Sequence, residues 1–241
     1  AYEIRLSLVG SEMCIRDRIE RMGSLRDLVL TVFILGMLPA VLARPWWGIL
    51  LWTWVGLMNP HKMTWGFAYS FPFAMIIAIV TLLAIFISRE PKKLPLTAPV
   101  AMLIIFNVWL TITTILYALY PDIAWIKWEK VIKIQILTFM TLLLLTSRQK
   151  VNLLVWAIVF SLAFYGVKGG IFTIANGGVH RVQGPIGTFI GGNNELALAM
   201  VMTIPLMYYL FSTTSRKWVK YGLVFAMVLC AFSILGSQSR G

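Results

Sequence analysis

Charged residues are scarce in this 241-residue chain, at 12% of the total, whereas about 25% is usual in a soluble domain. Hydrophobic residues account for 59%, and the mean hydropathy is +0.83. Apolar runs recur from Leu28 almost to the C-terminus, each close to the ~20 residues that cross a bilayer core. A transmembrane β-barrel would instead show alternating segments of about ten residues. We therefore expect an all-α polytopic integral membrane protein.

Cysteine is also scarce, and several common catalytic motifs are missing. Only Cys14 and Cys230 occur, without a CxxC pair or a His/Cys cluster, so the sequence predicts neither a disulfide framework nor a metal site. No Walker motif, GxSxG, HExxH or pair of in-span carboxylates is present. These absences argue against an ATPase, a protease and a simple proton pump.

Acidic residues number only nine against 21 lysines and arginines, which gives a formal net charge of +12. Such an excess can indicate nucleic-acid binding. Here, however, the basic residues stand in short loops beside hydrophobic runs, as the positive-inside rule predicts. Because no separate basic domain is present, we expect no nucleic-acid partner and a surface in contact with membrane lipids.

The first 18 residues, AYEIRLSLVGSEMCIRDR, match the translation of a sequencing-library adapter. Two adapter pieces account for most of residues 1–4 and 8–18, and the gap between them has room for a short index. We therefore expect residues 1–18 to be an adapter-derived artefact and the natural start to be Met22. Their removal leaves Cys230 as the sole thiol.

The remaining chain contains about eight candidate transmembrane segments. They cover residues 28–43, 46–58, 71–87, 98–117, 132–146, 153–174, 196–211 and 221–235. The first two are short and are separated only by Arg44 and Pro45, where proline interrupts the helix. Neither an internal repeat nor a long linker indicates a second domain.

Three short loops are strongly basic: residues 88–93, 147–150 and 215–220. An even number of candidate spans separates each of them from the next, so all three can lie on one side of the membrane. The positive-inside rule assigns that side to the cytoplasm. Residues 59–70, 118–131 and 176–195 then face outward. The same alternation places Arg26 outside.

The outer segment GGVHRVQGPIGTFIGGNNE, residues 177–195, is the most unusual stretch. Arg181 lies within it, and Arg240 is expected on the same face, so that two guanidinium groups can grip a phosphate or diphosphate. Glycines such as Gly184 let the backbone approach an anion and point N–H groups at it. Asn193 and Asn194 either bind the substrate or cap the helix that follows.

Three further polar features stand out. Lys168, the only charge in its apolar stretch, either serves a function within the membrane or reaches the interface from a helix that ends near Gly166. His180 is either a proton carrier or an incidental loop histidine. Lys130 belongs to a lysine and tryptophan stretch at 121–134, which is typical of an interfacial helix that meets lipid phosphates or of a plain aromatic belt. The tryptophans of residues 46–54 are expected to face lipid or the core rather than a sugar.

Five ordered blocks carry a resemblance that extends from Met22 to Gly241. They are RPWWGILLWTWVGLMNPHKMTWGFAYSFPFA (44–74), WEKVIKIQILTFMTLLLL (128–145), FYGVKGGIFTI (164–174), GPIGTFIGGNNELALAMVMTIPL (184–206) and LGSQSRG (235–241). This set resembles the exosortase A system-associated O-glycosylation ligases, which belong to the O-antigen ligase and polymerase superfamily of bacterial inner-membrane proteins.

The resemblance implies a GT-C-like glycosyltransferase that moves a glycan from undecaprenyl diphosphate to an acceptor hydroxyl on the periplasmic face. The acceptor is a protein or a saccharide. Arg181 and Arg240 match the family positions that hold the diphosphate leaving group, and no metal or other cofactor is implied. Residues 19–241 are then the N-terminal portion of a single ligase domain. A large periplasmic loop that activates the acceptor is expected beyond Gly241, so we expect this portion to be inactive alone.

Two other functions stay open at this level. A polysaccharide polymerase of the same superfamily would extend a lipid-linked chain instead of transferring it to a final acceptor. A membrane transporter or flippase would use the glycine-rich segments and Lys168 to line a pathway.

Overall fold

The computed structural model describes residues 25–88, 94 and 96–238, and all regular structure within them is helical. The helices begin with Leu25–Ala43 and continue along the chain. They are α2 (Trp46–Met58), η1 (Pro60–Met63), η2 (Phe67–Tyr69), α3 (Phe73–Ile87), α4 (Ala98–Leu116), α5 (Pro121–Leu144), α6 (Arg148–Ala175), α7 (Asn193–Thr213) and α8 (Lys217–Gly236).

Five of these helices are long and apolar enough to cross a membrane: Leu25–Ala43, α4, α6, α7 and α8. Helices α2 and α3 are apolar but shorter. The expectation of an all-helical chain with several membrane-length helices is therefore confirmed. Residues 1–18 and Arg240, to which specific predictions were attached, lie outside the described residues.

Helix α5 corrects one expected boundary. Residues 121–134 were expected to be either an interfacial helix or an aromatic belt at the boundary of the span 132–146. The observed helix Pro121–Leu144 contains this stretch and most of the expected span. Proline stands at its first position, where it is tolerated, and no glycine or proline interrupts the rest. The charged stretch and the apolar stretch therefore belong to the same helix.

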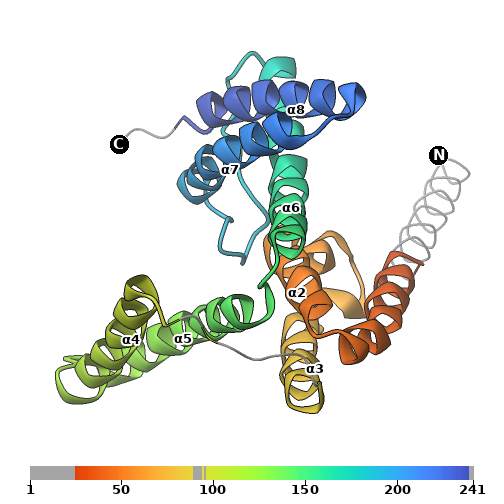
Figure 1. Cartoon of the computed structure of the whole chain (residues 1–241). Coiled ribbons are helices and arrows are strands. Elements are labelled where there is room, and N and C mark those ends of the chain that lie inside the picture. The colour runs from red at the N-terminus through yellow and green to blue at the C-terminus, as the bar shows by residue number, and fades with distance from the viewer. Residues whose placement is uncertain (1–24, 89–93, 95, 239–241) are drawn as a thin grey trace, which may run out of the picture.

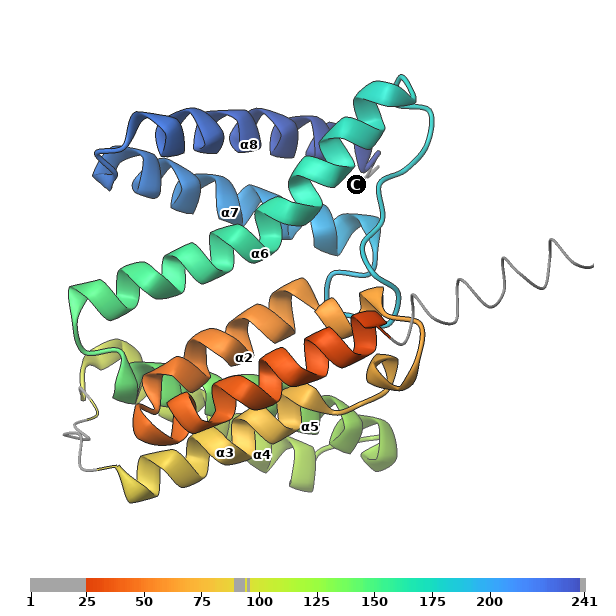
Figure 2. The same cartoon turned by 90° about the vertical axis from the view of Figure 1, so that its right-hand side faces the viewer.

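The helix ends form two groups at opposite ends of the molecule (Figure 2). The turns before α2, before α6 and before α8 lie at one end, together with the end of α3 and the start of α4. The segments between α2 and α3, between α4 and α5, and between α6 and α7 lie at the other end. The described parts of the basic loops and the glycine-rich segment are thus separated by the length of the helices.

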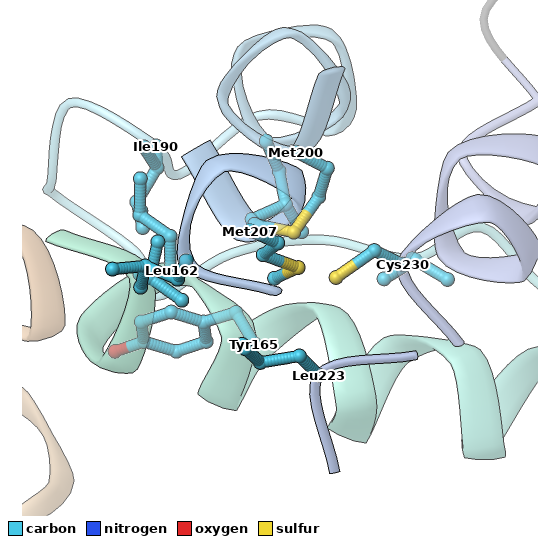
Figure 3. Packing of buried hydrophobic residues seen from close by; sticks show 11 residues of the cluster. Leu162, Tyr165, Ile190, Met200, Met207, Leu223 and Cys230 are labelled. Carbon is cyan, nitrogen blue, oxygen red and sulfur yellow. The ribbon is translucent and has the colours of Figure 1, made fainter. Parts of the chain in front are cut away.

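Three groups of helices are visible in Figure 1. Helices α6, α7 and α8 pack together, helix Leu25–Ala43 packs with α2 and α3, and α4 and α5 form a hairpin to one side. Figure 3 shows the core of the first group, in which the sulfur atoms of Met200, Met207 and Cys230 point toward one another. Tyr165 points its hydroxyl away from them and donates it to the carbonyl of Met58, which ties α6 to the end of α2.

Glycines on one face of α6 set its distance from α8. A Cβ atom on Gly170 would lie 2.2 Å from the carbonyl oxygen of Leu229, and one on Gly169 would lie 2.3 Å from the Ser233 hydroxyl. Small residues of this kind let transmembrane helices approach closely. The stretch YGVKGG therefore places its glycines against α8 and leaves Lys168 exposed.

Candidate functional site

A cavity of about 570 Å³ lies at the end of the molecule that carries the glycine-rich segment. Four segments contribute to its wall: the first described turn of helix Leu25–Ala43, the region around η1, the second half of α6, and residues 181–185. The start of α7 adds one residue. The cavity therefore exists only where segments far apart in sequence meet.

Four basic side chains line this cavity: Arg26, Lys62, Lys168 and Arg181. Neither aspartate nor glutamate is among its described lining residues. Arg26, Lys168 and Arg181 are exposed, and their side chains make no hydrogen bond or ion pair with any described residue. Because like charges gathered around one hollow repel one another unless an anion enters, the arrangement favours an anionic ligand.

Lys62 is more constrained than the other three cations. Its ammonium donates to the carbonyl oxygen of Tyr69 at 3.3 Å and stands 4.0 Å from the centre of the Tyr69 ring. Both contacts orient the side chain and leave the ammonium further donors for a ligand.

The glycine-rich segment is a fixed loop, tied to the end of α8. Buried Val182, directly after Arg181, donates its backbone N–H to the carbonyl of Gly236 at 3.1 Å. Gln238 donates its side-chain amide to the carbonyl of Gly178. These bonds hold the backbone on both sides of Arg181, so the position from which its guanidinium reaches the cavity is set.

Gly184 lines the cavity, but its N–H group is already used. It donates to the carbonyl oxygen of Gly191 at 3.2 Å. A Cβ atom at Gly184 would lie 1.7 Å from the carbonyl oxygen of Ile190. This glycine therefore closes the loop upon itself, and its N–H does not point at an anion as we expected.

The two asparagines lie at the start of α7, where a helix was expected to begin, but neither caps it. Helix α7 begins at Asn193, and its N-cap is Gly192 without a side-chain cap, so the asparagine-cap alternative is wrong. The Asn193 side chain instead donates to the carbonyl of Ser237 at 2.9 Å. Asn194 is exposed, and neither asparagine is among the residues that line the cavity.

Lys168 lies well inside α6, which continues to Ala175. The alternative in which the helix ends near Gly166 is therefore wrong. The physical reason is the close packing of the α6 glycines on α8, which stabilises helical residues that would otherwise be weak helix formers.

The other residues singled out from the sequence do not line the cavity in the described part of the chain. Lys130 is exposed on α5, in the hairpin that Figure 1 shows apart from α6–α8, and it does not line the cavity. His180 is exposed beside Phe172, with 6.5 Å between ring centres. Arg240 lies outside the described residues, although Gln238, two positions earlier, contacts the loop that carries Arg181.

The sequence of the chain matches one family model. Residues 25–215 match the family of unknown function DUF5935. The chain belongs to this family. No curated protein and no solved structure matched the chain.

In this DUF5935 protein, an apolar groove of about 580 Å³ adjoins the basic cavity. It runs between helix Leu25–Ala43 and the end of α2 with η1, and apolar side chains such as Val29, Phe33 and Trp54 form most of its wall. Arg26 and Met63 line both hollows. The cationic cavity and the apolar groove are therefore neighbours, and this arrangement suits a ligand with an anionic head and a hydrocarbon chain.

Two buried polar groups lie near this junction. Asp27 is 1% exposed and its Oδ1 has no hydrogen-bond partner among the described residues. His61 Nδ1 is likewise buried and without a described partner. Burial, and secondly the charge of Lys62, lowers the pKa of His61 from its ordinary value of 6.5, so the ring favours its neutral form.

Sequence reasoning missed Arg26, Lys62 and Trp65 as lining residues. The alternation of basic loops had already placed Arg26 and the 59–70 segment on the same side as Arg181, and that was the available signal. The described residues contain no group of three His, Cys, Asp or Glu side chains that could hold a metal ion.

Proposed function

We propose that this protein is a membrane glycosyltransferase of the O-antigen ligase type. It takes a glycan from undecaprenyl diphosphate and passes it to an acceptor hydroxyl, of a protein in O-glycosylation or of a saccharide. The observation that carries the proposal is the cavity lined by Arg26, Lys62, Lys168 and Arg181, with an apolar groove beside it.

The chemistry of the reaction matches this arrangement. Transfer from a lipid diphosphate breaks the bond between the sugar and the phosphate oxygen, and negative charge grows on the departing diphosphate. Fixed cations that meet this charge stabilise the transition state, and the loss of one such donor typically costs about 100- to 1000-fold in rate. Arg181 is suited to this role because its planar fork can donate two hydrogen bonds to one phosphate.

The apolar groove is evidence that the substrate carries a lipid chain. An undecaprenyl chain needs a continuous hydrocarbon surface that begins where its phosphates end. The groove begins at Arg26 and Met63, which also line the cavity. The outer flank of the groove is helix Leu25–Ala43, one of the five membrane-length helices.

The membrane arrangement that we propose is the bacterial inner membrane, with about eight spanning segments in a GT-C-like bundle and the cavity on the periplasmic face. The basic loops support this orientation, because their described parts lie at the end opposite the cavity (Figure 2). Arg240, which lies outside the described residues, is proposed as the second guanidinium group that holds the diphosphate.

Lipid binding by the purified chain in nanodiscs tests the proposal. We expect undecaprenyl diphosphate to bind and undecaprenol, which lacks the phosphates, to bind far more weakly. Arg181→Ala and Lys168→Ala should each weaken diphosphate binding, since a hydrogen bond to a charged group contributes about 1.5–3 kcal/mol, or roughly 10- to 100-fold in Kd. Lys130→Ala, which changes a cation outside the cavity, is the matched control.

Equal affinity for the two lipids, or full affinity in both cavity variants, would refute the anion site. Transfer itself is measured in the host strain, with Arg181→Ala introduced at the native gene. We expect full-length glycan chains that stay unattached while the protein remains in the membrane. Shortened chains would instead support the polymerase, and movement of lipid-linked glycan without any transfer would support the flippase.

A further inference from the structure

Trp65 combines an exposed side chain with a position on the wall of the basic cavity. It is 76% exposed and lines the cavity together with Lys62, Lys168 and Arg181. Its indole ring makes neither a hydrogen bond nor a ring contact with any described residue. A single exposed aromatic ring is ordinary by itself, but this one stands on the wall of a cation-lined cavity, where a ligand can contact its face.

The tryptophans of the 46–54 run show the contrast. Trp47, Trp52 and Trp54 are half-buried and pack against the core cluster of α2, α3 and helix Leu25–Ala43. Trp46 and Trp47 stack upon each other with ring centres 4.6 Å apart. These rings contribute to packing, as expected, whereas Trp65 does not.

The backbone on both sides of Trp65 is held in place. Thr64 is buried, and its hydroxyl donates to the carbonyl of His61 at 2.7 Å. On the other side, the buried carboxylate of Asp27 covers Gly66 so closely that a Cβ there would lie 2.0 Å from Oδ2. Trp65 is therefore presented by a fixed segment, and its exposure does not result from a loose chain.

We infer that Trp65 is a stacking platform for the sugar ring that is attached directly to the diphosphate. This inference rests on the proposed function, because the phosphates must first occupy the cationic cavity. In a lipid-linked glycan the first sugar follows the phosphate without a spacer, so its ring lies beside the anion. The C–H groups of a pyranose carry partial positive charge, and the face of an indole ring is negative. Trp65 therefore offers the apolar face of the sugar a matching surface next to the cations.

A membrane-interface anchor is the competing role, since tryptophan is enriched where a bilayer meets water. The chain contains a suitable control for it. Trp218 is 88% exposed in the first turn of α8, at the opposite end of the molecule and outside the cavity. A substitution there removes an interfacial ring without changing the cavity.

The experiment measures binding of two lipids to the purified chain in nanodiscs: undecaprenyl diphosphate, and the same lipid carrying one N-acetylhexosamine. We expect the wild type to prefer the glycosylated lipid by about tenfold, the size of one aromatic contact. Trp65→Ala should abolish this preference and leave the affinity for the bare diphosphate unchanged. Trp65→Phe should retain most of the preference, and Trp218→Ala should retain all of it.

Each other outcome has a definite meaning. A preference that survives in Trp65→Ala, or a wild type that binds both lipids equally, overturns the platform. Equal loss of both lipids in Trp65→Ala also overturns it and supports a role in shaping the cavity. Failure of the wild type to bind either lipid refutes the proposed function itself. Where the wild type binds, we expect Arg181→Ala to weaken both lipids, and full binding of both by Arg181→Ala refutes the anion site independently of Trp65.

Discussion

The side-chain amide of Asn193 donates a hydrogen bond to the backbone carbonyl of Ser237 at 2.9 Å. It joins the first residue of α7 to the residue that follows α8, 44 positions later in the chain. Ser237 is buried, so this carbonyl has little access to water. Together with the bond from Val182 to Gly236, it fastens the glycine-rich loop to the end of α8.

Replacement of Asn193 should therefore loosen this loop. We expect Asn193→Ala to lower the free energy of unfolding by about 1 kcal/mol, because a buried carbonyl loses its partner. Exposed Asn194, the next residue, provides the control, and Asn194→Ala should change little. Thermal unfolding of the two variants in detergent measures the difference. Equal melting temperatures would show that the bond contributes nothing.

The contact between α6 and α8 depends on Gly170. In Gly170→Ala the new Cβ would meet the Leu229 carbonyl at 2.2 Å, so α8 must shift. We expect the cost of overpacking, typically ~1–3 kcal/mol, to exceed the ~1 kcal/mol that alanine gains over glycine in a helix. Gly222, in α8, has nothing within 4 Å of its Cβ position, and Gly222→Ala should be neutral or stabilising. Stability of Gly170→Ala at or above that of the wild type would contradict the packing described.

Tyr165 connects the two helix groups that border the cavity. Tyr165→Phe removes the hydrogen bond to the Met58 carbonyl and should cost about 1 kcal/mol of stability. We also expect weaker binding of undecaprenyl diphosphate, because α6 carries Lys168 and the end of α2 leads into the segment with Lys62. Tyr208→Phe, which changes an exposed tyrosine of α7, is the control for both measurements.

The lowered pKa of His61 makes stability depend on pH. The unfolded chain takes up this proton near the ordinary pKa of 6.5, whereas the folded protein takes it up only at a lower pH. Between these two values the unfolded state holds more protons, so stability decreases as the pH falls. We expect His61→Gln to reduce the loss of thermal stability between pH 7.5 and pH 5.

The second histidine of the chain serves as the control for that titration. His180 is exposed, and the chain has only these two histidines. His180→Gln should leave the pH dependence as it is in the wild type. A pH dependence in His61→Gln identical to that of the wild type would contradict the assignment to His61.

Much of the helical layout could be predicted from local patterns. Pro45 and the apolar run after it predict the start of α2, and the observed helix covers the expected residues 46–58. The helix that holds most of the expected span 132–146 begins earlier, at Pro121, because a change in polarity does not interrupt a helix when no breaking residue accompanies it. Lys168 was ambiguous for a different reason: glycines that suggest a helix end can equally form a helix–helix contact.

The candidate site was only partly predictable. Arg181 and Lys168 stood out because each is a charge in an otherwise apolar or glycine-rich stretch, and the structure places both on the wall of one cavity. Arg26 and Lys62 looked like ordinary flanking charges. Their role depends on the packing of helix Leu25–Ala43 and η1 near α6, and no local pattern reports that packing.

The sequence alone determined that this protein is helical and that its long helices suit a membrane, through hydropathy and proline positions. Loop charge determined that the basic loops lie on the opposite side from the glycine-rich segment. These are local properties, set by the cost of exposing the backbone and charges to hydrocarbon. Only the tertiary structure decided which cations share a cavity, that an apolar groove lies next to it, and that Trp65 lines the cavity. Those relationships arise from close packing between segments more than a hundred residues apart, as between Tyr165 and Met58.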